Sequence, residues 1–260
     1  MQRIFMLLSI FFTVFSCSND ENILTPAELD DPSKMIVFCQ ASQEDPWRTL
    51  DYKYDNNGNL ITEISMRDEK VQSEITYEYD SDNLLTTEVH LTDDSKTEKT
   101  FVYNESKQLI NVLYKFTNYD SDGNVTNESE SEAPREYDGS QLIKEWESWG
   151  GFNTYEYLNG KIITEINHTK NGSKHHFTYY KYSGDLLVEE KKENKVGGLI
   201  HFKTYVYDSQ NRLIQIRDRE NIIEESDYND NKLIEKREYY FGIDPCYSAC
   251  CGNFIYSYEY

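Results

Sequence analysis

The chain has 260 residues, enough for one large domain or two small ones. Its net charge of −21 would repel phosphate backbones, so we expect no nucleic-acid partner. Tyrosine is over-represented, with 22 copies against 5 prolines, and it favours the half-buried surfaces of β-sheets. Acidic residues recur along the whole chain, which indicates a solvated, self-repelling surface; the alternative is an acidic surface that binds cations or basic partners.

Residues 1–16 have the layout of a bacterial export signal. Arg3 precedes two apolar runs, and the segment is shorter than the ~20 apolar residues that a membrane span requires. The end of this segment, Val14-Phe15-Ser16-Cys17, resembles a bacterial lipoprotein leader. The resemblance implies cleavage before Cys17 and attachment of acyl chains such as palmitate to its thiol. The alternative is an ordinary secretory signal in which Cys17 stays a plain thiol.

Residues 17–46 are expected to be a lipidated cysteine, a flexible acidic tether and a first strand at 35–38. Acyl chains on Cys17 would anchor the protein without a transmembrane helix. The following Ser18-Asn19-Asp20-Glu21-Asn22 resembles the acidic tags that send lipoproteins to the outer face of the outer membrane; the alternative is an ordinary polar tether. We therefore expect a lipid-anchored protein of the bacterial outer membrane, exposed at the cell surface.

One motif recurs through residues 47–260, the expected β domain with a cysteine-containing C-terminal cap. It reads aromatic, any residue, aromatic, Asp or Asn, a Gly/Asn-rich turn, two aliphatics and an acid, with the first clear copy at 52–64. Further copies begin at Tyr77, Phe101, Tyr137, Tyr155, Tyr180, Tyr205 and Tyr228. The mean step of about 25 residues fits two strands and two turns, so each copy is predicted to be one hairpin.

Alternation along a strand places Tyr52 and Tyr54 on one face and Lys53 on the other. Three pairs, Asn57-Gly58, Asp122-Gly123 and Asn159-Gly160, are expected to supply the positive φ angles of tight hairpin turns.

The two aliphatics of each copy, such as Leu60 and Ile61, should point to opposite faces. Either both faces are partly covered, as in a rolled sheet, or one aliphatic stays on a half-wet surface. The predicted fold class is therefore all-β, with tandem antiparallel β-hairpins in an extended sheet that we expect to be rolled or spiral.

These units resemble YD repeats, the tyrosine-aspartate repeats of the Rhs family. The likeness covers residues 47–240 and is strongest at 52–61 and 205–214, where Tyr-x-Tyr-Asp is followed by a turn and Leu-Ile. The resemblance implies an antiparallel β architecture and surface display.

Four cysteines follow Cys17, namely Cys39, Cys246, Cys250 and Cys251. An even number in an exported chain favours disulfides, and four cysteines allow three pairings. Because the adjacent Cys250 and Cys251 are poor partners for each other, we expect Cys39 to pair with one member of the C-terminal cluster and Cys246 with another. The alternative is a four-thiolate zinc site.

No cofactor, metal site or catalytic residue is predicted. The segments 55–59 and 120–124 resemble the start of a calcium loop, but the glutamate at the twelfth position is missing, so both are predicted to be turns. His175 and His176 are adjacent on an expected strand and should point apart, so joint chelation of one metal is not expected. Nucleotide-binding and hydrolase motifs are missing from the sequence.

Trp146 and Trp149 lie next to Gly150-Gly151 and could form a sugar-stacking platform; the alternative is two core residues of a small β-sheet. The first functional hypothesis is a non-enzymatic binding or structural module at the cell surface, with an unknown extracellular protein or polysaccharide as partner. The second is glycan binding through Trp146 and Trp149, and the third is hydrolysis.

Overall fold

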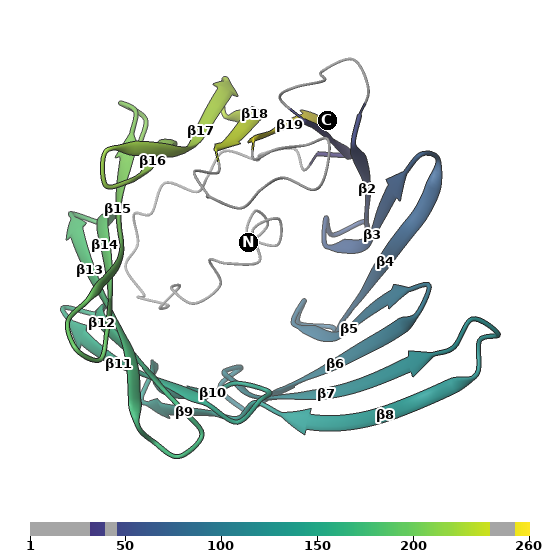
Figure 1. Ribbon diagram of the computed structural model, residues 1–260, viewed down its shortest axis with the longest axis horizontal. Helices are drawn as coiled ribbons and strands as arrows, with labels where there is room; N and C mark the ends of the chain where they lie inside the picture. The colour runs from purple at the N-terminus through teal and green to yellow at the C-terminus, as the bar shows by residue number, and fades with distance from the viewer. Residues whose placement is uncertain (1–31, 40–45, 240–252) are drawn as a thin grey trace. The chain divides into compact units, whose positions relative to one another are not determined.

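The computed structural model describes residues 32–39, 46–239 and 253–260, and all regular structure in these ranges is β-strand (Figure 1). The strands are β1 (Lys34–Cys39), β2 (Arg48–Tyr54), β3 (Leu60–Arg67), β4 (Lys70–Tyr79), β5 (Leu85–Thr92), β6 (Ser95–Tyr103), β7 (Leu109–Tyr119), β8 (Val125–Glu132), β9 (Arg135–Asp138), β10 (Gln141–Trp146), β11 (Phe152–Leu158), β12 (Lys161–His168), β13 (Lys174–Ser183), β14 (Leu186–Asn194), β15 (Leu199–Tyr207), β16 (Leu213–Asp218), β17 (Asn221–Asn229), β18 (Lys232–Tyr239) and β19 (Asn253–Glu259). The prediction of an all-β chain of antiparallel hairpins is confirmed. The rolled form of the whole sheet stays a prediction.

The chain divides into two compact units, and the first contains residues 52–65 and 71–177. Strands β4 to β8 pair antiparallel in chain order, and β9 to β12 do the same. Two backbone hydrogen bonds between Val112 and Ala133 attach the β8–β9 junction to β7. The buried apolar residues of this unit are Tyr52, Tyr77, Val112, Ala133, Tyr155, Ile162 and Ile166.

The second unit contains residues 32–39, 46–51, 66–70, 178–239 and 253–260 among those described. Strands β14 to β19 pair antiparallel in chain order, and β1 then lies between β19 and β2. The predicted first strand is therefore present, and it joins the beginning of the described chain to its end. The buried apolar residues of this unit are Met35, Val37, Leu50, Tyr205 and Ile216.

The Asp or Asn that follows the aromatic pair holds the hairpin turn. Asp55 Oδ1 accepts hydrogen bonds from the backbone N–H groups of Asn57 and Asn59, at 2.8 and 2.7 Å. The same bonds, to the second and fourth residues onward, form at Asp80 and Asp208 of the motif, and also at Asp120 and Asn194, which begin turns outside the motif copies. The motif therefore needs a short side-chain acceptor at this position because it replaces backbone partners within the turn.

The turn pairs differ in part from the prediction. Asn159 and Gly160 both have positive φ, as expected for a two-residue turn, but in the other two pairs only Gly58 and Gly123 do. The prediction for Asn57 and Asp122 is wrong because these turns are one residue longer and need a single left-handed residue near their end.

A β-bulge explains the aliphatic pair of the motif. Tyr157 lies opposite Ile162 and Glu156 lies opposite Thr164, so Ile163 is an extra residue in its strand. The second aliphatics Ile110, Ile214 and Ile234 are extra in the same way. The bulge interrupts the strict alternation on which the prediction of opposite faces rested, and Ile234 stays 42% exposed.

The second aromatic of the motif links its repeat to the preceding one through a hydrogen bond from its hydroxyl to a backbone carbonyl, which we call the clip. The Tyr79 hydroxyl donates a 2.9 Å hydrogen bond to the Leu60 carbonyl, one repeat earlier. Equivalent bonds link Tyr103 to Leu85, Tyr137 to Leu109, Tyr157 to Leu142, Tyr207 to Leu187, Tyr228 to Leu213 and Tyr260 to Leu233. The recurring tyrosine is therefore a structural donor, and burial accordingly raises the pKa of Tyr79 to about 12.

We expect Tyr207→Phe to lower the free energy of unfolding by about 1 kcal/mol, because the Leu187 carbonyl loses its donor. Tyr119→Phe is the matched control, since Tyr119, like Tyr207, directly precedes the aspartate of a hairpin turn, but its hydroxyl bonds to none of the described residues. Urea unfolding of both variants measures the difference. Equal effects would contradict the clip.

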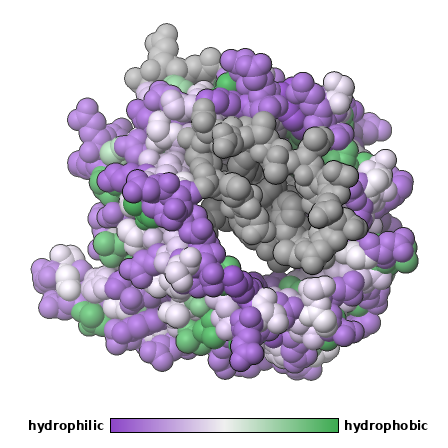
Figure 2. All heavy atoms as spheres, turned by 180° about the vertical axis from the view of Figure 1, so that it is seen from behind, coloured by the Kyte–Doolittle hydropathy of each residue, from purple (hydrophilic) through white to green (hydrophobic). Residues whose placement is uncertain are grey.

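The surface is mainly polar. Figure 2 shows hydrophilic residues over most of the face in view and apolar residues in small separate patches. Within the described ranges no helix has the length and apolar character needed to cross a membrane.

Candidate functional site

A line of buried and half-buried charges crosses the second unit, which we call the buried charge row. It is formed by Glu190, Lys203, Glu224, Lys236 and Glu238. Glu190, Glu224 and Lys236 are only 8%, 9% and 5% exposed. Strand alternation places them on the face that also buries Tyr205 and Ile216. Charged groups at this depth require partners, so their contacts decide what they can do.

Glu190 has three cationic or hydroxyl partners from β15. Its carboxylate accepts hydrogen bonds from His201 Nε2 at 2.6 Å and from the Tyr205 hydroxyl at 2.9 Å, and Lys203 Nζ lies 3.7 Å away. Burial favours the neutral acid, but these three contacts outweigh it and lower the pKa of Glu190. Burial and the neighbouring carboxylate raise the pKa of Tyr205. Glu190 is therefore an anion held between fixed donors.

Lys236 lies between two carboxylates. Its Nζ is 2.6 Å from Glu238 and 3.6 Å from Glu224, and the Tyr256 hydroxyl donates a 2.8 Å hydrogen bond to Glu238. Burial raises the pKa of Glu224 even though the Lys236 charge opposes the shift. A buried acid with a raised pKa is found in functional sites and in structural ion pairs alike, and the contacts of Glu224 described here are those of an ion pair.

The stability that Glu190 contributes should depend on pH. Its pKa is lower in the folded protein than the ordinary 4.5, so its contribution is present above that value and is lost as pH falls through the folded pKa. We expect Glu190→Gln to cost about 2 kcal/mol at pH 7 and progressively less below about pH 4. Urea unfolding at several pH values measures this, and a cost independent of pH would contradict the assignment.

The first unit has a similar buried pair. Glu145 accepts hydrogen bonds from the Tyr155 hydroxyl at 2.6 Å and from Arg135 Nε at 3.0 Å. Burial, followed by the charge of Glu145, raises the pKa of Glu147, which also accepts a hydrogen bond from Asn153. The first tyrosine of the motif, here Tyr155 and above Tyr205, thus binds a carboxylate of the preceding strand.

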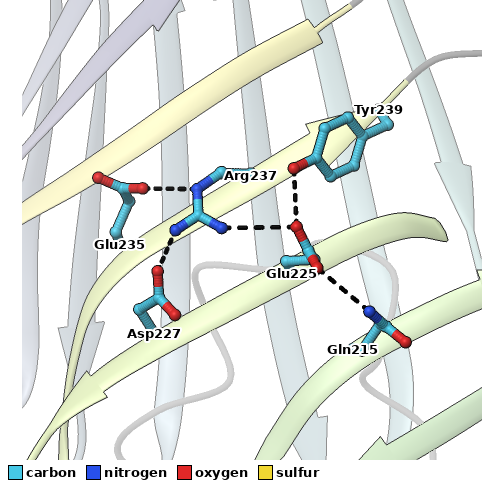
Figure 3. Close-up of polar contacts among 6 residues, drawn as sticks. All are labelled: Gln215, Glu225, Asp227, Glu235, Arg237 and Tyr239. Atoms are coloured by element: carbon cyan, nitrogen blue, oxygen red, sulfur yellow. Dashed lines mark hydrogen bonds and ion pairs between the residues drawn. The ribbon is translucent and has the colours of Figure 1, made fainter.

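A half-buried polar network lies on β16, β17 and β18 (Figure 3). Arg237 contacts Glu235 at 2.7 Å, Glu225 at 3.5 Å and also Asp227. Glu225 accepts further hydrogen bonds from the Tyr239 hydroxyl at 2.8 Å and from Gln215 at 3.1 Å. The Tyr239 bond is the main reason that the pKa of Glu225 is lowered. The network joins three strands and leaves three carboxylates around one guanidinium.

The structure separates the two predicted glycan-binding residues. Trp146, in β10, packs against Phe152, and Lys144 Nζ lies 3.8 Å from the centroid of the Trp146 ring. Trp149 belongs to the next turn and is 57% exposed. Its ring lies directly over Gly151, where even a Cβ atom would meet the indole at 1.8 Å. Trp149 therefore offers an open ring face, whereas Lys144 already covers a face of Trp146.

The predicted cysteine and lipid sites lie mostly outside the described residues; this applies to Cys17, Cys246, Cys250 and Cys251. The backbone of Cys39 is at the end of β1, opposite Phe254 of β19. Disulfide formation between Cys39 and the C-terminal cluster stays a prediction.

The prediction that His175 and His176 point apart is wrong. Their ring centroids lie 3.8 Å apart, because strand alternation fixes only the Cβ directions and rotation of the side chains brings the rings together. The segments 55–59 and 120–124 are turns, as predicted. Across the described ranges, no group of three or more His, Cys, Asp or Glu side chains is arranged to hold a metal ion.

Sequence reasoning missed two features of this region. The buried charge row was hidden because acids and lysines are abundant on the surface strands of this chain. The last repeat, Tyr258-Glu259-Tyr260, could have been found, since it copies Tyr77-Glu78-Tyr79, and Tyr260 makes the same clip to Leu233.

No family model matches the chain, and no curated protein matches it. Similar solved structures include a TcdB2-TccC3-Cdc42 complex, 11% identical with a TM-score of 0.28 over 75% of this chain and 16% of that chain. A porin-like protein from Bacteroides uniformis ATCC 8492 is 12% identical with a TM-score of 0.42 over 88% and 98% of the two chains. A DUF3836 family protein from Parabacteroides distasonis ATCC 8503 is 16% identical with a TM-score of 0.21 over 33% and 91%.

This chain thus spans about a sixth of the length of the first of these structures. All three likenesses have TM-scores below 0.5 and identities below 25%.

Proposed function

We propose that this protein is a non-enzymatic scaffold of YD-type repeats, anchored to the bacterial outer membrane through lipid on Cys17 and presenting its polar surface to an extracellular partner. The observation that supports a scaffold is the recurring clip from tyrosine hydroxyl to carbonyl, as in Tyr79 to Leu60. The characteristic residues of the motif therefore have structural roles: the Asp or Asn holds the turn, and the tyrosine links one repeat to the next.

The buried ionisable groups support the same proposal. Glu190 is bound to His201 and Tyr205, and Lys236 is bound to Glu238, so these groups stabilise neighbouring strands. Catalysis by any of them would require breaking a buried pair, which typically costs about 3–5 kcal/mol.

Labelling with a radioactive fatty acid in the native host tests the anchor, and protease treatment of intact cells tests display. The wild type and a Cys39→Ala control should incorporate label, whereas Cys17→Ala should not. Protease added to intact cells should remove the body of the protein, that is, the repeat domain of residues 47–260. Label retained in Cys17→Ala would overturn lipid attachment at this residue, and a body protected in intact cells but digested after lysis would overturn surface display.

Glycan binding is the second candidate, and the exposed ring of Trp149 over Gly151 favours it. Aromatic rings with an open face can stack on sugars. Glycan-array binding should be lost in Trp149→Ala and retained in Trp146→Ala, because Lys144 already covers the Trp146 ring. Absence of glycan binding by the wild type, or equal binding by Trp149→Ala, would remove this candidate.

A further inference from the structure

Strand β8 has a hydrogen-bonding partner on one side only. It pairs with β7 from Leu113↔Glu132 to Tyr119↔Val125, and no other described strand pairs with it. On its other side, the last link is the hydrogen bond from the Trp146 N–H to the Pro134 carbonyl, after which the chain turns at 147–151. Figure 1 shows β8 running alongside β7 beyond this point. The edge of β8 is therefore free among the described residues.

The free backbone groups of this edge belong to the glutamates. Val112 and Ala133 exchange both of their backbone hydrogen bonds. In an antiparallel ladder every second pair is hydrogen-bonded, so the next bonded pairs are Tyr114↔Ser131 and Phe116↔Ser129. The intervening residues Glu128, Glu130 and Glu132 lie in non-bonded pairs, and their N–H and C=O groups point away from β7. This edge is a template for an added strand.

The side chains of the edge set the chemistry of such a strand. Alternation places Glu128, Glu130 and Glu132 on one face, and seven of the eight residues of β8 are exposed. Lys115 lies 3.3 Å from Glu128 and the Asn111 amide binds Glu132, while Glu130 has no ion pair with any described residue. A second copy of β8 would place glutamates opposite glutamates, which is destabilising, whereas lysine or arginine at alternate positions would be stabilising.

We propose that β8 binds an extended segment of a partner protein that carries lysine or arginine at alternate positions, by adding it as a strand to this edge. Backbone hydrogen bonds to the glutamate positions would align the segment, and the three carboxylates would select its charge. The inference rests on the proposed role as a binding module and names its site and the chemistry of its partner, but it does not depend on the lipid anchor.

The test uses the full mature chain and a fluorescent eight-residue peptide of alternating threonine and lysine. Fluorescence anisotropy should show binding, and hydrogen exchange should slow at the amides of Glu128, Glu130 and Glu132. A peptide of alternating proline and lysine, with equal charge but half the N–H donors, should bind at least about tenfold more weakly.

Two variants separate strand addition from charge attraction. Glu130→Pro removes an outward N–H without touching the β7 ladder, and should weaken peptide binding about tenfold with little loss of stability. Changing Glu128, Glu130 and Glu132 together to glutamine should also weaken it about tenfold. The matched control removes three exposed charges elsewhere, at Glu69, Asp93 and Glu105, and should leave affinity within about twofold.

Three outcomes would overturn the proposal. Unchanged binding by Glu130→Pro, or equal weakening by the control, would mean that the peptide is attracted to the acidic surface as a whole. If the wild type binds no peptide and the triple glutamine variant dimerises in analytical ultracentrifugation, the glutamates serve to keep copies apart. Loss of fatty-acid labelling or of protease accessibility would instead affect only the proposed anchor and display.

Discussion

Lys236→Met should lower the free energy of unfolding by about 3–5 kcal/mol at pH 7, because it leaves the buried carboxylate of Glu224 and the half-buried carboxylate of Glu238 without their shared cation. Lys236 is 5% exposed and lies between Glu238 and Glu224. Methionine preserves most of the side-chain volume, so the loss reports on charge more than on packing. Urea unfolding measures it, with the exposed Lys195→Met as the matched control, expected to change stability by less than about 0.5 kcal/mol.

Lowering the pH should rescue this variant. Without Lys236, only the charge of Lys203 opposes the burial that already raises the pKa of Glu224, so this carboxylate should bind a proton more readily in the folded state. A folded-state pKa above the unfolded value makes stability rise as pH falls, which is the opposite sign to Glu190. Adding Glu224→Gln and Glu238→Gln to Lys236→Met should recover much of the lost stability at pH 7. A cost that is the same from pH 7 to pH 4 would show that Lys236 acts through packing alone.

Local patterns predicted the repeat well. The alternation at Tyr52-Lys53-Tyr54 fixed which residues are covered, and the acceptor and glycine at Asp55 and Gly58 fixed the turn. These features depend on backbone geometry within about six residues, so they can be deduced without knowing what packs nearby.

The bulges were harder to foresee, although their signal was present. An aliphatic pair is compatible with a sheet covered on both faces and also with one extra residue in a strand. The structure shows the second arrangement at Ile163 and Ile214. The recurrence of the pair at the same point of every repeat is the observation that could have decided between them.

The buried charge row was beyond sequence reasoning because its members are ordinary residues of a charged chain. Nothing in the sequence distinguishes Lys236, at 5% exposure, from the exposed Lys195. The distinction arises from which strands lie side by side, and that register is set over the whole unit. The free edge of β8 likewise depends on the length of a neighbouring strand, because β10 ends at Trp146 and does not extend along β8.

Met35→Asp should cost more than about 4 kcal/mol, because it buries an unpaired carboxylate in the strand that joins the two ends of the described chain. Met35 is 8% exposed and lies opposite Leu50 of β2 and Tyr258 of β19. Detachment of β1 would leave one edge of each of these strands unpaired, so hydrogen exchange should accelerate on β1 and β19 before the rest of the second unit.

Two controls isolate the effect of burial at this position. Val196→Asp adds the same charge at an 81% exposed turn and should change stability by less than about 0.5 kcal/mol, while Met35→Leu should cost less than about 1.5 kcal/mol. If Met35→Asp behaved like Val196→Asp in urea unfolding, the pairing of β1 with β19 would not contribute to the stability of the second unit. If instead its cost is large and confined to β1 and β19, the last repeat depends on the first strand for its edge.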